Sequence, residues 1–160
     1  MGIKNALASV AEYATCLILY YWLTVGIHEY LHLNVLRWLG GDGHIILTYY
    51  GGAMVFDKMS PVSYSFLLTS LAGGIGVAAI YGLLALWNWK DGDIEEWAAL
   101  LPISAMQLGY GVYEGIFLSI LPFQTFLDYA WIPTTIGFGI VAVPTVWLLV
   151  NSVYAQLVAK

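Results

Sequence analysis

The stretch "TVGIHEYLHLNVLRWLGG", residues 24–41, decides how this chain is interpreted, because it places ionisable side chains among apolar ones. His28 and His32 are four residues apart, so on a helix both imidazoles project from one face, one turn from each other. That spacing lets two imidazole nitrogens bind one metal ion. Glu29 completes an H-E-x-x-H pattern, in which the glutamate takes a proton from the metal-bound water instead of binding the metal. The stretch therefore predicts a catalytic zinc site on a helix.

The composition around this stretch indicates an integral, multi-pass membrane protein. The 160 residues are 61% hydrophobic and 9% charged, and the mean hydropathy is +0.79. Soluble domains carry about 25% charged residues, and one membrane span needs about 20 apolar residues. We predict an all-α membrane protein of one domain, residues 1–160, with transmembrane helices over residues 13–39, 62–89, 97–121 and 131–158. Its orientation stays open, because the few Lys and Arg residues are divided between the two sides.

A short β-hairpin is expected between the first and second helices, over residues 44–57. Two short strands, "HIILTYY" and "AMVFD", are joined at Gly51-Gly52, which is a hairpin signal. Backbone of this kind is tolerated at membrane depth only where it is buried in protein or lines a wet cavity. The hairpin therefore implies a cavity nearby, or lies at the membrane surface.

A catalytic zinc needs a third protein ligand and keeps its fourth position open for water. Glu114 is favoured, because it lies inside the third predicted helix, where a buried acid requires an explanation. Gln107 and Gly111 share its helical face. Asp128 is the alternative third ligand, in the expected connection to the fourth helix, and His44 is the remaining imidazole, expected on a surface loop.

The order of these motifs resembles the motif order of the site-2 proteases, a family of intramembrane zinc metalloproteases. The resemblance covers about residues 20–120. Its parts are a two-histidine motif in a predicted span, a glycine pair before a hairpin, a small-residue segment in the next span, and an acid followed by glycine. In this sequence they are His28-Glu29-x-x-His32, Gly40-Gly41, Ala72-Gly73-Gly74 and Glu114-Gly115.

The resemblance implies a zinc endopeptidase that cleaves membrane-embedded substrates. In that family three core helices carry the zinc site, and the hairpin is thought to present the substrate in extended form. The last core helix supplies an aspartate from an L-D-G motif, whose place Tyr113-Glu114-Gly115 takes here. The implied residues are Glu29 as general base, His28, His32 and Glu114 as zinc ligands, and Gly51, Gly52 and Gln107 in contact with substrate.

The chain also departs from the family's pattern. Ala72-Gly73-Gly74 stands where the family has alanine, glycine and proline, and the asparagine-proline signature before the acid is absent. Leu127-Asp128 matches the L-D pair, but Tyr129 follows it in place of glycine. The sequence is therefore interpreted as a divergent, minimal member.

Two other functions stay open on the same residues. The chain is alternatively a proteolytically inactive subunit of a larger membrane complex, in which a structural metal or a polar network fastens helices together. The second alternative is an ion or proton transport component, since ionisable groups inside spans often line such a path. An open coordination position beside Glu29 distinguishes the protease from the inactive subunit.

The expected partners follow from the same reading. They are membrane lipids, a transmembrane protein substrate, and either a membrane protein partner or a second copy of this chain. A net charge of -5 argues against nucleic acid as a partner. Cys16 is the single cysteine, so an internal disulfide is excluded.

Overall fold

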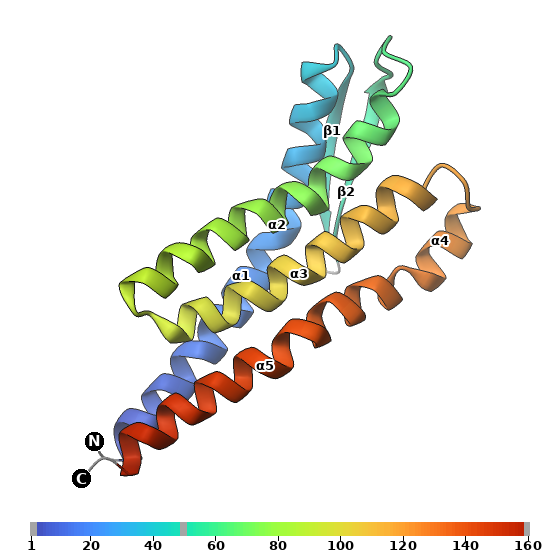
Figure 1. Cartoon of the computed structure of the whole chain (residues 1–160). Helices are drawn as coiled ribbons and strands as arrows, with labels where there is room; N and C mark the ends of the chain where they lie inside the picture. The colour runs from blue at the N-terminus through green and yellow to red at the C-terminus, as the bar shows by residue number, and fades with distance from the viewer. Residues whose placement is uncertain (1–2, 49–50, 159–160) are drawn as a thin grey trace.

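The computed structural model describes residues 3–48 and 51–158 and is mostly helical (Figure 1). Helix α3 lies between α2 and α5 in one layer, and α1 packs across that layer. The prediction of a helical chain with one hairpin is confirmed in this outline. The elements are α1 (Ile3–Trp38), β1 (Asp42–Thr48), β2 (Gly51–Lys58), α2 (Ser65–Asp91), α3 (Ile94–Phe117), α4 (Phe123–Tyr129) and α5 (Trp131–Val158).

Two boundaries differ from those predicted. The first helix begins at Ile3 instead of residue 13, because the apolar segment before the two-histidine motif continues the same helix. The expected connection before the last helix contains a helix of its own, α4. Pro122 precedes α4 with extended backbone (φ -54°, ψ 138°), so α3 cannot continue through it and a new helix begins at Phe123.

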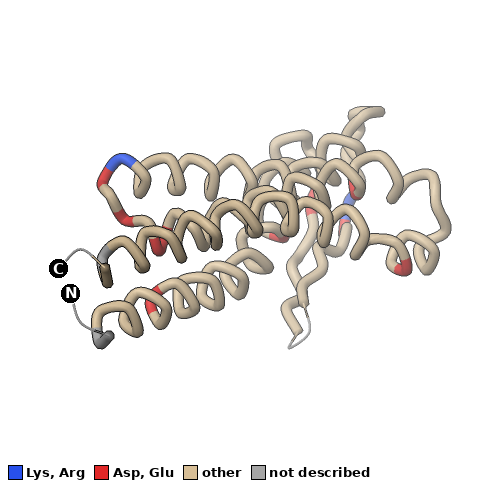
Figure 2. The backbone as a smooth tube through the Cα atoms, turned by 60° about the horizontal axis from the view of Figure 1, so that its bottom comes forward, with Lys and Arg blue, Asp and Glu red and all other residues tan. Residues whose placement is uncertain are grey.

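Three helical segments are long and apolar enough to span a membrane: Asn5–Trp38, Ser65–Asp91 and Phe123–Ala155. Helix α3, which we expected to be a fourth span, is not among them. Gln107 and Glu114 lower its hydropathy, and both are buried between the neighbouring helices. Lys, Arg, Asp and Glu lie mainly near the two ends of the bundle, and its middle is almost free of them (Figure 2).

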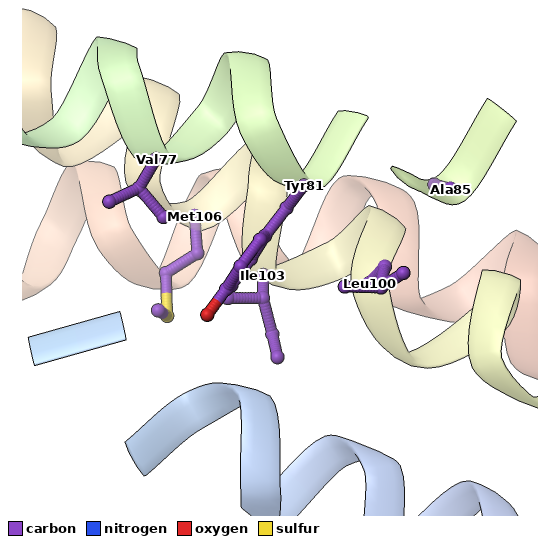
Figure 3. Packing of buried hydrophobic residues seen from close by; sticks show 6 residues of the cluster. All are labelled: Val77, Tyr81, Ala85, Leu100, Ile103 and Met106. Carbon is purple, nitrogen blue, oxygen red and sulfur yellow. The ribbon is translucent and has the colours of Figure 1, made fainter. Parts of the chain in front are cut away.

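Apolar side chains from α2 and α3 form the core of the bundle (Figure 3). Tyr81 extends from α2 between Ile103 and Met106 of α3, and its hydroxyl donates to the carbonyl of Tyr20 on α1 at 3.0 Å. One residue therefore connects three helices. The cluster consists of Val77, Tyr81, Ala85, Leu100, Ile103 and Met106.

Helices α2 and α3 approach closely where two glycines face each other. A Cβ atom on Gly111 would lie 2.7 Å from the Cα atom of Gly74, closer than such atoms pack. Small residues allow helices in lipid to pack backbone against backbone in this way. The contact sets the position of the α3 face that carries Gln107 and Glu114 against α2.

The turn between α2 and α3 holds the two helices in this antiparallel arrangement. Gly92 ends α2 in the left-handed region (φ 82°), and its amide donates to the carbonyl of Asn88. Asp93 then caps α3, because its carboxylate accepts a hydrogen bond of 3.0 Å from the amide of Glu96.

The hairpin is present, but its turn is not at Gly51-Gly52. The antiparallel register pairs Thr48 with Gly51, so both glycines belong to β2. The predicted strand end at Tyr49 and Tyr50 lies outside the described residues. Both strands lie beside the second half of α1 (Figure 1). A Cβ atom on Gly52 would be 2.7 Å from Cγ of Glu29, so the backbone of β2 directly covers this glutamate.

Candidate metal centre

His28, His32 and Glu114 converge at the centre of the molecule, and all three are buried. Nε2 of His28 lies 2.8 Å from Nε2 of His32. Oε2 of Glu114 lies 3.2 Å from Nε2 of His28 and 3.4 Å from Nε2 of His32. The two histidines come from successive turns of α1, whereas the carboxylate comes from α3.

The outer nitrogen of each imidazole has its own hydrogen-bond partner. His32 donates from Nδ1 to the carbonyl oxygen of Thr69 on α2. Nδ1 of His28 lies 2.9 Å from Oε1 of Gln107 on α3, to which it donates. A neutral imidazole that donates from Nδ1 presents a lone pair at Nε2. Both Nε2 atoms therefore face Glu114 as acceptors.

Three electron-rich atoms thus point at one another in an environment where water is scarce. Such an arrangement is unfavourable without a positive charge between the atoms. Zinc ligands at about 2.0–2.2 Å in tetrahedral geometry are separated by about 3.4 Å. The two distances from Glu114 to the imidazoles, 3.2 and 3.4 Å, match this value, and the distance between the imidazoles is shorter. The donor set of two imidazoles and one carboxylate fits a catalytic zinc ion.

Gly73 places the backbone of α2 directly against this centre. A Cβ atom on Gly73 would meet Nε2 of His32 and would lie 2.6 Å from Nε2 of His28. The imidazoles are held on their other side by Thr69 and Gln107, so they cannot move aside without losing these partners. The small-residue segment of α2 therefore shapes the centre itself as well as the helix packing.

Two cavities border the centre, and Glu29 lines both of them. The first, of about 340 Å³, also contacts His28 and contains the polar residues Thr24 and Thr134. The second, of about 260 Å³, lies on the hairpin side and contacts His32 and Glu114. Glu29 is half-buried and is not part of the three-residue cluster. It therefore lies beside the cluster and is not one of its three members.

The other residues that the sequence suggested for the site lie outside the cluster of His28, His32 and Glu114. Asp128 is exposed on α4, accepts a hydrogen bond of 3.1 Å from Gln124, and lies outside the cluster, so the structure favours Glu114 over it. His44 is exposed on β1 and pairs with Asp57 at 2.8 Å. Gly52 lines both cavities, whereas Gly51 lines another one further along the hairpin.

Sequence reasoning missed two residues of this site. Tyr110 lines both cavities, and its ring centroid is 5.4 Å from that of His28. It lies three residues after Gln107 and four before Glu114, so the helical period could have indicated it. Thr69 acts through its carbonyl group, which leaves no signal in a sequence.

Comparison of the chain with known proteins finds no matching family model, no matching curated protein and no matching solved structure.

Proposed function

We propose that this chain is an intramembrane zinc metalloprotease, a divergent minimal relative of the site-2 proteases, which hydrolyses peptide bonds of membrane-embedded substrates. The observation that carries the proposal is the convergence of His28, His32 and Glu114 with both outer imidazole nitrogens hydrogen-bonded. This arrangement provides three ligands for a zinc ion, which bound there would polarise a water molecule and the substrate carbonyl.

The membrane setting is supported by the distribution of polarity. Three helical segments have the length and hydropathy of membrane spans, and large apolar side chains on their outer faces are exposed. In water such a surface would be a strong aggregation liability. In a bilayer it faces lipid, and the polar centre lies between helices, where ionisable groups in membranes are usually found.

Glu29 is the general base of the proposed reaction. It lines both cavities beside the centre, so a peptide bound in either of them would contact it. There it accepts a proton from the attacking water and then transfers that proton to the leaving nitrogen of the peptide bond. Gln107 positions His28 through their hydrogen bond, which keeps the ligating nitrogen directed at Glu114.

The two alternative functions receive less support. A purely structural metal would be closed off by a fourth protein ligand, but here the centre borders two cavities. A transport path would need polar groups facing it along the bundle. In α5, Thr145 and Asn151 donate their side-chain hydrogen bonds to carbonyls of their own helix. Thr134 donates to the carbonyl of Ala130, directly before α5.

Metal analysis and a cleavage assay on the same purified samples test the proposal. Wild type is expected to contain zinc and to cleave a transmembrane reporter. Glu29→Gln is expected to retain zinc and lose cleavage, whereas Glu114→Ala loses zinc as well. Glu12→Gln, which changes an exposed acid on α1, is the matched control and should behave as wild type. Folded wild-type protein without zinc would contradict the proposal.

A further inference from the structure

We propose that the cavity on the hairpin side of the metal centre is a subsite for one bulky apolar side chain of the substrate, next to the bond that is cleaved. The inference rests on the proposed function, and it specifies the kind of substrate side chain that the enzyme selects. The cavity has a volume of about 260 Å³.

The two ends of this cavity differ in chemistry. At one end it contacts the polar groups of Glu29, His32 and Glu114, where the peptide backbone would bind. Most of its other lining residues are apolar and come from the hairpin, the end of α3 and the short helix α4, and Ser70 of α2 and Tyr110 of α3 line it as well. The apolar residues include Met54, Phe56, Leu118, Phe123, Phe126 and Leu127. A polar mouth with an apolar interior fits an amino-acid residue whose backbone stays at the metal centre.

The apolar wall is formed before any ligand binds, because contacts on its outer side hold it in place. Phe126 is 2% exposed, and its carbonyl accepts a hydrogen bond of 3.0 Å from the Tyr113 hydroxyl. The rings of these two residues are stacked with centroids 5.0 Å apart. On the hairpin side, Phe56 stacks on Phe66 of α2 at 6.0 Å. A preformed apolar pocket binds its ligand without the cost of ordering it.

The occupant is a substrate side chain and not a lipid tail. A lipid chain that filled the cavity would place hydrocarbon against the polar groups of Glu29, His32 and Glu114 and would offer them no hydrogen-bonding group. A peptide residue provides a backbone amide and carbonyl at that end. The other cavity combines aromatic residues with the polar side chains of Thr24, Gln107 and Thr134, so its lining is more mixed and would accept a less apolar residue.

Two small probes test the subsite independently of peptide cleavage. Phenylalanine hydroxamate and alanine hydroxamate share a zinc-binding group and differ only in the side chain. We expect zinc-loaded wild type to bind the phenylalanine probe at least about tenfold more tightly, since apolar pockets discriminate by roughly 10–200-fold per methylene. Binding is measured by titration calorimetry on the full-length protein in detergent.

Ala53→Phe fills the cavity from the exposed side of β2 and should abolish the preference while alanine hydroxamate still binds. Leu127→Trp narrows the same cavity from α4 and should also abolish the preference for the phenylalanine probe. It provides the test if Ala53→Phe does not fold. Ala79→Phe, the same substitution at an exposed position of α2, is the control and should keep the preference.

The outcomes separate the two proposals. If wild type contains zinc and binds both hydroxamates equally, the subsite is wrong and the metalloprotease proposal is unaffected. A preference for the phenylalanine probe that survives both Ala53→Phe and Leu127→Trp would also overturn the subsite proposal and leave the metalloprotease proposal unaffected. If folded wild type contains no zinc and binds neither probe, the proposed function fails and the subsite fails with it.

Discussion

The carbonyl oxygen of Thr69 accepts a hydrogen bond from Nδ1 of His32, and this contact determines which nitrogen of the imidazole faces Glu114. A backbone carbonyl can only accept, so His32 carries a proton on Nδ1 and directs Nε2 at Glu114. The contact also links α1 to α2 at the level of the centre. The tautomer of His32 is therefore set by the main chain of a neighbouring helix.

Gly73→Ala is expected to abolish zinc binding. The new Cβ atom would lie 2.6 Å from Nε2 of His28, within the space that the ligating nitrogens occupy. Zinc content of the purified variant, measured by atomic emission, checks this. Gly82→Ala on the same helix is the control, because its Cβ atom would be 3.4 Å from Oγ of Ser104, an ordinary contact. Wild-type zinc content in Gly73→Ala would show that the centre does not bind metal between these imidazoles.

Gln107→Leu should weaken zinc binding without removing it. The variant deletes the acceptor for Nδ1 of His28 and leaves all three ligands in place. Loss of a partner of this kind typically lowers metal affinity by about 10–100-fold. Competition with a fluorescent chelator measures the affinity. Gln107→Glu keeps an acceptor oxygen and should recover most of it, whereas equal weakening by both variants would exclude the positioning role.

Gly111→Val is expected to destabilise the bundle. Its Cβ atom would lie 2.7 Å from the Cα atom of Gly74, and backbone atoms cannot move aside as a flexible side chain can. Overpacking of this kind costs about 1–3 kcal/mol. Thermal unfolding in detergent should show a lower midpoint than for wild type. Gly139→Ala, where nothing lies within 4 Å of the new atom, is the control and should not lower the midpoint, because Ala favours a helix over Gly.

The start of the hairpin should respond to acid. A hydrogen bond from the Arg37 side chain, at 2.8 Å, and one from the Gly43 amide lower the pKa of Asp42 below its usual range. Because the folded pKa is lowered, the contact stabilises the fold at higher pH and is lost as the pH falls through the lowered pKa. Titration of the Asp42 carboxyl by NMR measures this pKa. It should rise in Arg37→Gln, and an unchanged value would show that Arg37 is not its cause.

Local patterns in the sequence were sufficient for the long helices, for the presence of the hairpin and for two of the three residues of the centre. Two short strand-like segments joined at Gly51-Gly52 predicted the hairpin, and the spacing of His28 and His32 placed both imidazoles on one face of a helix. These features depend on neighbours a few residues apart. The same patterns placed the hairpin turn at Gly51-Gly52, which is wrong, because the pairing partner of Thr48 is Gly51 and register is set between strands.

The choice between Glu114 and Asp128 needed the tertiary structure. Both were acids at plausible positions in the sequence, but only their distance from α1 in space separates a ligand from a surface residue. That distance depends on the close packing of α2 on α3 at Gly74 and Gly111, contacts between residues far apart in the chain.

The sequence by itself thus determined that the chain is apolar and helical and that two histidines share one helical face, because these properties arise from composition and from the helical period. The tertiary structure decided that Glu114 completes the cluster, that Thr69 and Gln107 orient the imidazoles, and that the hairpin covers Glu29. The physical reason is that these contacts join different elements, and their geometry depends on how the helices pack and not on any local pattern.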